Sequence, residues 1–146
     1  MTFVHASCIA LRRGRAWAGV LLRGPSGAGK SDLALRLVEG GARLIADDQT
    51  HLARRGRAVI ATAPPSLAGL IEVRGVGIVR LTPAQRLAHA PLALLVDLVA
   101  AEQIERLPEP VTESVLGVAL PVVALAAFEA SAPAKLRLAL RRGAVA

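Results

Sequence analysis

The feature that most constrains this chain is a glycine-rich loop followed at once by a lysine and a serine. Glycines let successive backbone N–H groups turn toward an anion, and the positive end of a following helix favours the same charge. In such a loop the lysine contacts the outer phosphates and the serine hydroxyl binds Mg²⁺. The residues match the pattern G-x-x-x-x-G-K-[ST] at every fixed position: Gly24, Pro25, Ser26, Gly27, Ala28, Gly29, Lys30 and Ser31.

Chance does not account for this match. A shuffled chain of this composition would contain the pattern about once in a thousand sequences. The context agrees, because an apolar run at residues 16–23 precedes the loop and a helical pattern at residues 31–41 follows it. We therefore predict that residues 24–31 bind the phosphates of a nucleotide.

Composition narrows the class of protein further. A chain of 146 residues allows one domain, 1–146, and its 53% apolar content excludes intrinsic disorder. Three aromatic residues are too few for base-stacking platforms, so we expect no nucleic-acid partner. The single Cys8 cannot form an internal disulfide, and no apolar run reaches the roughly 18 residues that a membrane span needs. We expect a cytoplasmic protein without membrane association.

The net charge of +7 leaves several partners open. It suits phosphate ligands, nucleic acid or an acidic protein, and arginine can also serve solubility alone.

The apolar periodicity predicts an α/β protein. Strands are expected at residues 3–11, 16–23, 43–46, 51–54, 57–62, 70–73, 76–81 and 92–99, and helices at 31–41 and 132–142. Residues 102–113 are acidic and contain two prolines, so we interpret them as a surface connection.

Two acidic positions are candidates for the chemistry that a phosphate loop cannot supply. Asp47 and Asp48 follow the strand predicted after the loop's helix, where an α/β site collects its acidic groups, although an acidic turn is the alternative. If the strand continued through both, only one carboxylate could face the site. Glu72 stands alone in an apolar strand and could bind a metal or pair with Arg74.

Three motifs in this order resemble the HPr kinase/phosphorylase family: the loop at 24–31, Leu-Ile-Ala-Asp-Asp at 44–48 and Ile-Glu-Val-Arg-Gly-Val-Gly-Ile at 71–78. The resemblance implies a P-loop domain of the phosphoenolpyruvate carboxykinase-like type, a mixed sheet with few helices. It also implies a catalytic domain without the N-terminal regulatory domain, similar to the short form known in α-proteobacteria.

The resemblance further implies an ATP-dependent enzyme that phosphorylates a serine of HPr, or of an HPr-like phosphocarrier, and that catalyses phosphorolysis in reverse. Self-association is a further expectation. Ser31 and Glu72 would hold Mg²⁺, and Asp47 would be the base toward serine and the acid in reverse. Asp48, Arg74 and His5, which falls near a family histidine ahead of the loop, complete the candidate catalytic set.

Two alternatives remain. A small-metabolite kinase would use an arginine cluster such as Arg54, Arg55 and Arg57. A non-catalytic nucleotide sensor would explain why the family's C-terminal Gly-Arg-Asn region has no clear counterpart here.

Overall fold

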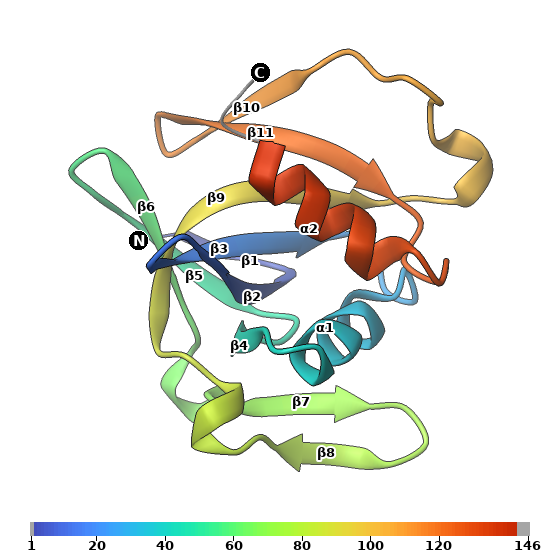
Figure 1. Ribbon diagram of the computed structural model, residues 1–146. Coiled ribbons are helices and arrows are strands. Elements are labelled where there is room, and N and C mark those ends of the chain that lie inside the picture. The colour runs from blue at the N-terminus through green and yellow to red at the C-terminus, as the bar shows by residue number, and fades with distance from the viewer. Residues whose placement is uncertain (1, 143–146) are drawn as a thin grey trace.

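The computed structural model describes residues 2–142, which form one curled nine-stranded sheet, a separate two-stranded hairpin and two α-helices (Figure 1). The helices are α1 (Lys30–Glu39) and α2 (Ala132–Arg142), and the 3₁₀ turns are η1 (Pro65–Leu67), η2 (Pro83–Gln85) and η3 (Ala101–Gln103). The strands are β1 (Thr2–Val4), β2 (Ala6–Arg13), β3 (Ala16–Arg23), β4 (Arg43–Ala46), β5 (Thr50–Arg55), β6 (Ala58–Thr62), β7 (Leu70–Val73), β8 (Gly77–Arg80), β9 (His89–Leu98), β10 (Val111–Val115) and β11 (Val118–Leu125).

The direction of the strands gathers the functional loops at one edge. The centre of the sheet is parallel, since β9 pairs in parallel with both β3 and β11. Strand β2 pairs antiparallel with β3 on one side and β4 on the other, so β4 runs in the same direction as β3. The carboxyl ends of β3, β4, β9 and β11 therefore lie along one edge, where α/β proteins place their ligands.

Both faces of the central sheet are buried. Alternate residues of β2 show this, because Ile9 packs in the core beneath the helices and Cys8 packs in a second core on the opposite face. Helices α1 and α2 cover the first face, with Leu33 and Leu136 fully buried against it. Burial on both sides explains why β3 and β9 are continuous apolar runs rather than alternating ones.

The mixed α/β architecture with few helices is confirmed. The expected strand at residues 3–11 is wrong as one element, because the chain bends at His5 and β1 leaves to pair with β5. The surface connection at 102–113 is also partly wrong, since its last three residues belong to β10, which pairs with β11. The prolines before β10 hid this strand, which depends on its partner for its hydrogen bonds.

Within residues 2–142, neither helix has the length and apolar character needed to cross a membrane.

Candidate active site at the glycine loop

The glycine loop turns the amino end of α1 toward the open edge of the sheet. Gly29 precedes the helix with φ of 100°, a left-handed conformation that favours glycine. The first backbone hydrogen bond of the helix runs from the Leu33 N–H to the Gly29 carbonyl. The N–H groups of the turn before Leu33 are therefore directed outward, which makes this end of α1 suited to an anion.

Two glycines of the loop are required by space, and one of them, Gly29, is required by conformation as well. A Cβ on Gly29 would lie 2.7 Å from the Ala127 Cβ and 3.0 Å from the Phe128 ring. A Cβ on Gly24 would lie 2.9 Å from the Ala28 Cβ. The loop is thus packed tightly against the segment that follows β11. Its tip, formed by Pro25, Ser26 and Gly27, is exposed to solvent.

Lys30 is buried although it carries a charge. Its side chain is 8% exposed, and its ammonium donates to the carbonyls of Gly24 at 2.7 Å and Pro25 at 3.2 Å. The nearest carboxylate oxygen, Oδ1 of Asp48, lies 3.9 Å from Nζ. A buried ammonium needs such partners, and here the loop's own carbonyls supply them.

Asp47 is the most connected side chain of the site. Its Oδ1 accepts hydrogen bonds from the hydroxyls of Ser31 at 2.7 Å and Ser7 at 2.9 Å, and its Oδ2 accepts from the Glu72 N–H at 3.0 Å. These donors come from α1, β2 and β7, three elements far apart in the sequence. The carboxylate is therefore fixed in position directly beside the candidate metal-binding hydroxyl.

Asp48 lies beside Lys30, at the same site as Asp47. Strand β4 ends at Ala46, so the two carboxylates are not forced onto opposite faces of a continuing strand. Asp48 instead has φ of 64°, a left-handed conformation that aspartate tolerates better than most residues. Its side chain is 64% exposed and lies on the Lys30 side. Both acidic residues thus flank the glycine loop.

Ser7 is a member of the site that sequence reasoning missed. It is fully buried in β2, donates to Asp47 and accepts a hydrogen bond from the Asp48 N–H at 3.0 Å. One serine therefore orients both members of the acidic pair. A small polar residue inside an apolar strand was the available signal, because a buried hydroxyl needs a partner.

Glu72 and Arg74 lie on the β7–β8 hairpin beside α1. The backbone of Glu72 contacts Asp47, whereas its side chain is exposed. Arg74 is exposed in the turn after β7, and no ion pair joins it to Glu72 in residues 2–142. The hairpin is held to the core through the buried Ile71. The alternative that Arg74 neutralises Glu72 is thus wrong for this conformation.

His5 lies at the bend between β1 and β2, two residues before Ser7. Its side chain is exposed and packs edge-to-face on Phe3, with ring centroids 5.8 Å apart. Among the described residues it has no hydrogen bond to the glycine loop or to the acidic pair.

An ion-pair cluster anchors the strand that leads into the loop. Arg23, the last residue of β3, donates to Asp97 at 2.7 and 3.1 Å and to Glu113 at 2.6 and 2.9 Å. The hydrogen bond to Glu113 raises the pKa of Arg23 above its usual value against the opposing effect of burial, and Asp97 adds to the rise. The same contact lowers the pKa of Glu113, which burial opposes. The cluster joins β3, β9 and β10 just before Gly24.

The residues present suit Mg²⁺, which prefers oxygen ligands. In proteins this ion is usually coordinated by one or two protein side chains, and substrate phosphates and water molecules complete its ligands. The Ser31 hydroxyl and the exposed carboxylate of Glu72, a residue whose backbone N–H bonds to Asp47, provide oxygens beside the glycine loop. No group of three or more His, Cys, Asp or Glu side chains within the described chain forms a ready-made metal cage. A site completed by phosphates does not need one.

Fold and site together define an α/β protein with a glycine loop at a helix N-terminus and an acidic pair beside it. Residues 2–136 match the family model described as HPr Serine kinase C-terminal domain, so the chain belongs to that family.

Similar proteins agree with this assignment. The "HPr kinase/phosphorylase" of Acidovorax sp. (strain JS42) is 42% identical over 112 residues, which is 68% of this chain and 35% of that protein. That of Bordetella pertussis is 39% identical over 116 residues, which is 73% of this chain and 38% of that protein. This chain therefore spans little more than a third of the length of these relatives. The structure titled Hpr(Ser) kinase/phosphatase from Coxiella burnetii has the same fold, with a TM-score of 0.85 and 24% identity over 99% of this chain and 97% of that one.

Proposed function

We propose that the protein is an ATP- and Mg²⁺-dependent serine protein kinase acting on HPr or an HPr-like phosphocarrier. The observation that carries the proposal is the contact of 2.7 Å between the Ser31 hydroxyl and the Asp47 carboxylate beside the glycine loop. It puts a candidate metal ligand and a candidate base side by side at a phosphate site. The names of the similar proteins, HPr kinase/phosphorylase, support the choice of substrate.

In this proposal residues 24–31 hold the phosphates of ATP as a P-loop of the phosphoenolpyruvate carboxykinase-like type. The outward N–H groups at the start of α1 bind the phosphate oxygens. Lys30 exchanges its bonds to the carbonyls of Gly24 and Pro25 for bonds to the outer phosphates. Asp48, 3.9 Å from the ammonium, keeps the lysine on the reacting side.

Ser31 and Glu72 are the proposed ligands of Mg²⁺, with Asp47 between them. Ser31 reaches Oδ1 of Asp47 and the Glu72 backbone reaches Oδ2, so both proposed ligands adjoin the same carboxylate. When bound, the metal ion neutralises phosphate charge during transfer. The Glu72 side chain is exposed and free to turn toward the phosphates.

Asp47 is the proposed base. The serine oxygen of HPr forms a bond to the γ-phosphorus, the bond from phosphorus to the β-phosphate oxygen breaks, and Asp47 takes the hydroxyl proton. In the reverse direction inorganic phosphate attacks phosphoserine, pyrophosphate forms and Asp47 returns a proton to the serine oxygen. Three hydrogen bonds from three elements hold the carboxylate where one group can serve both directions.

His5 and Arg74 are proposed to act at the edge of the site. Both are exposed, and Arg74 lies in the turn of the hairpin that carries Glu72. An arginine there can contact the transferred phosphate or the protein substrate. We also propose the cytoplasm as the compartment and self-association as the assembly; the unpaired, buried Cys8 agrees with a reducing environment.

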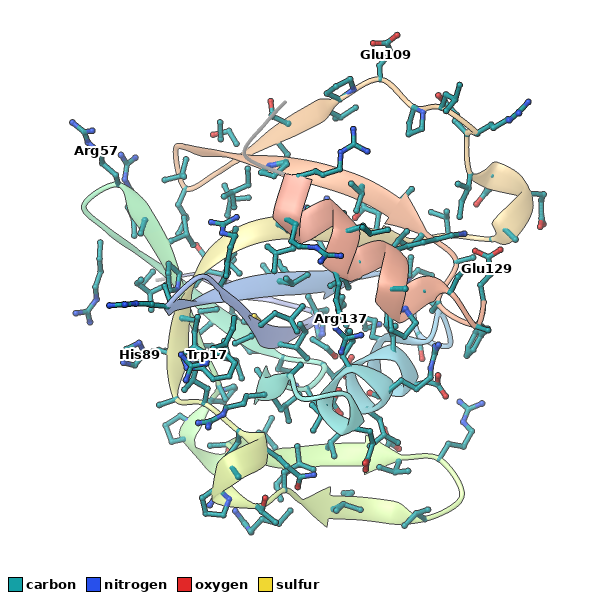
Figure 2. All side chains as sticks on the ribbon, in the orientation of Figure 1. Trp17, Arg57, His89, Glu109, Glu129 and Arg137 are labelled. Carbon is teal, nitrogen blue, oxygen red and sulfur yellow. The ribbon has the colours of Figure 1, made fainter. Side chains whose placement is uncertain are left out.

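The arrangement disfavours a small-metabolite kinase. Arg54, Arg55 and Arg57 lie at the far end of the β5–β6 hairpin, which begins beside Asp48 and runs away from it; Figure 2 shows Arg57 at the outer tip. Arg54 is already bonded to the carbonyls of Gly56 and Leu116.

The test is transfer from γ-labelled ATP to HPr in the presence of Mg²⁺. We expect the wild-type protein to label HPr, and Asp47→Asn to bind nucleotide normally but to lose at least about 100-fold in transfer, the lower range of general-base catalysis. Glu39→Gln, an exposed acid at the far end of α1, is the matched control and should keep full activity. Full transfer by Asp47→Asn would refute the base assignment.

The same purified protein can be used to test for phosphorolysis and for the non-catalytic sensor. Adding inorganic phosphate to phosphoserine-HPr tests phosphorolysis through the appearance of pyrophosphate. Nucleotide binding without transfer to HPr would instead support the non-catalytic sensor.

A further inference from the structure

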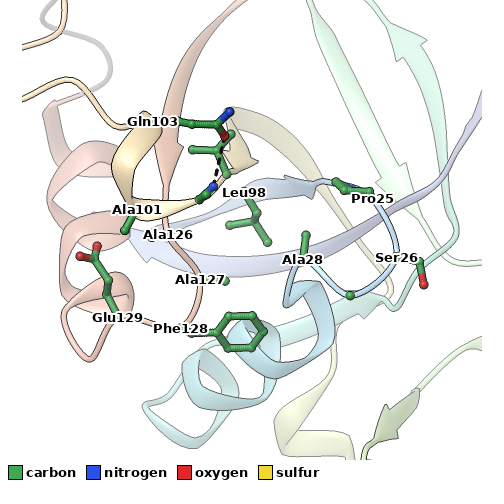
Figure 3. A pocket seen from close by; sticks show the side chains of 13 residues that line it. Pro25, Ser26, Ala28, Leu98, Ala101, Gln103, Ala126, Ala127, Phe128 and Glu129 are labelled. Atoms are coloured by element: carbon green, nitrogen blue, oxygen red, sulfur yellow. Dashed lines mark hydrogen bonds between the residues drawn. The ribbon is translucent and has the colours of Figure 1, made fainter.

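A hollow of about 760 Å³ lies on the side of the glycine loop opposite the acidic pair. It opens where the parallel strands β3, β9 and β11 end, so it occupies the same edge of the sheet as the candidate active site. One wall is the glycine loop, and the other walls are the segments at residues 98–103 and 126–129 (Figure 3). Its volume is within the range of pockets that enclose a whole small molecule.

The lining is apolar and carries one exposed aromatic ring. Most of the wall is aliphatic, including Leu98, Val99, Ala101 and Ala126. Phe128 is 69% exposed and lies against Gly29 of the loop, with Gln103 on the other side of the hollow. An aromatic ring left in solvent beside a phosphate loop is suited to cover the face of a flat, partly apolar group.

Gln103 and Glu129, two of the polar side chains that line the hollow, already have partners, and the third, Ser26, lies at the exposed tip of the loop. Oε1 of Gln103 accepts the Ala100 N–H at 3.3 Å, and Oε1 of Glu129 accepts from Lys135 at 3.1 Å. What remains is an apolar surface for stacking, beside a loop that binds phosphate. A nucleotide has this character, because its base is flat and apolar on its faces and its phosphates extend from the other end of the molecule.

The order of the strands gives the direction of the bound molecule. Asp47 and Asp48 follow β4, which lies beyond β2 on one side of β3, while the hollow follows β9 and β11 on the other side. A phosphate chain that crosses the start of α1 with its reacting end beside Asp47 therefore has its other end beside Phe128. A donor made only of phosphate would leave the hollow empty.

We propose that this hollow binds the purine nucleoside of the phosphate donor, with the base stacked against Phe128. The inference deepens the proposed kinase function and rests on it. It gives a nucleotide donor a contact that pyrophosphate cannot make. Arg36 keeps this wall in place, since its guanidinium donates to the carbonyls of Ala127 and Glu129 from α1.

The test compares ADP with pyrophosphate, because both contain the same two phosphates and only ADP contains a nucleoside. Dissociation constants are measured by calorimetry with Mg²⁺ for the wild-type protein and for Phe128→Ala. We expect the variant to weaken ADP binding by about 5- to 100-fold, the range for base stacking on an aromatic ring, and to change pyrophosphate binding less than twofold. Leu138→Ala, another exposed apolar residue, on α2, should change neither.

A second variant guards against a general effect on the loop. Phe128→Trp keeps an aromatic ring, so it should retain the ADP affinity of the wild type and gain a tryptophan signal that ADP quenches and pyrophosphate does not. Equal weakening of both ligands in Phe128→Ala, or unchanged ADP binding, would overturn the inference while leaving the glycine loop as a phosphate site. Failure of the wild type to bind either ligand would overturn the proposed function as well.

Discussion

At the scale of single residues, the site depends on one carboxylate and the hydroxyl groups that surround it. Asp47 accepts hydrogen bonds from Ser7 and Ser31, and Ser7 in turn accepts one from the Asp48 N–H. Hydrogen bonds to a charged acceptor are stronger than neutral ones, and their loss inside a protein leaves unpaired groups. Ser7 should therefore act as a positioning residue for the acidic pair.

We predict that Ser7→Ala lowers phosphoryl transfer without weakening nucleotide binding. The variant removes a donor from Asp47 and the acceptor of the Asp48 N–H, so the free energy of unfolding should fall by about 1–3 kcal/mol. Transfer kinetics should show a lower kcat and an unchanged KM for ATP, with chemical denaturation as the stability measurement. Ser66→Ala, an exposed serine in η1, serves as the control. A wild-type kcat in Ser7→Ala would contradict the positioning role.

We predict that Gly29→Ala weakens nucleotide binding. An alanine at φ of 100° is strained, and its Cβ would collide with Ala127 and Phe128, so the loop must move. ADP affinity, measured by calorimetry, should fall at least about tenfold. Gly27→Ala separates strain from collision, because Gly27 belongs to the same loop and has a positive φ of 86°, but nothing lies within 4 Å of the added Cβ. Equal ADP affinity in the two variants would be evidence against the collision.

At the scale of elements, the strand that leads into the glycine loop is secured by charges from two other strands. Arg23 ends β3 and is bonded to Asp97 of β9 and Glu113 of β10. Glu113 belongs to a segment that sequence patterns present as an acidic connection. Its role depends on the pairing of β10 with β11, which no local pattern of residues reports.

We predict that the Arg23–Glu113 contact makes stability sensitive to acid. The folded pKa of Glu113 lies below its ordinary value of 4.5, so its contribution is complete above that value and is lost as pH falls through the folded pKa. Because Glu113 is about half exposed, the effect should be small, about 0.2–1 kcal/mol. Urea denaturation at about pH 6 and pH 3 should show a larger loss of stability in the wild type than in Glu113→Gln. An identical loss in both proteins would exclude this linkage.

At the scale of the whole molecule, the central sheet separates two buried hydrophobic cores. Cys8 lies in the core opposite the helices and is fully buried, and burial raises the pKa of its thiol to about 12. With its pKa raised in this way, the Cys8 thiol is almost never ionised at neutral pH, and its burial keeps an alkylating reagent away from the sulfur.

We predict that Cys8 reacts with iodoacetamide only when the molecule unfolds. Labelling followed by mass spectrometry should be slow in the native protein and fast in denaturant. ADP should slow the native reaction further, because a ligand that binds only the folded state reduces the unfolded population. The Lys30→Ala variant, labelled under the same native conditions, is the control and should show no effect of ADP. Rapid labelling of the native protein would mean that the second core opens locally.

The sequence by itself determined the elements that carry their signals locally. The loop at 24–31 is recognisable because a phosphate-binding loop of this pattern needs glycines, a lysine and a serine at fixed positions, and the strands and helix around it follow from apolar periodicity. The acidic pair was likewise visible, since it directly follows a strand. Only the tertiary structure decided how these parts meet.

Asp47 contacts Ser7, Ser31 and Glu72 because β2, α1 and β7 converge on one end of β4. The hollow beside Phe128 exists because β9 and β11 run parallel to β3 and end at the same edge. The packing of the whole sheet determines the order of its strands and the contacts between residues that are tens of positions apart. A local residue pattern does not predict that packing.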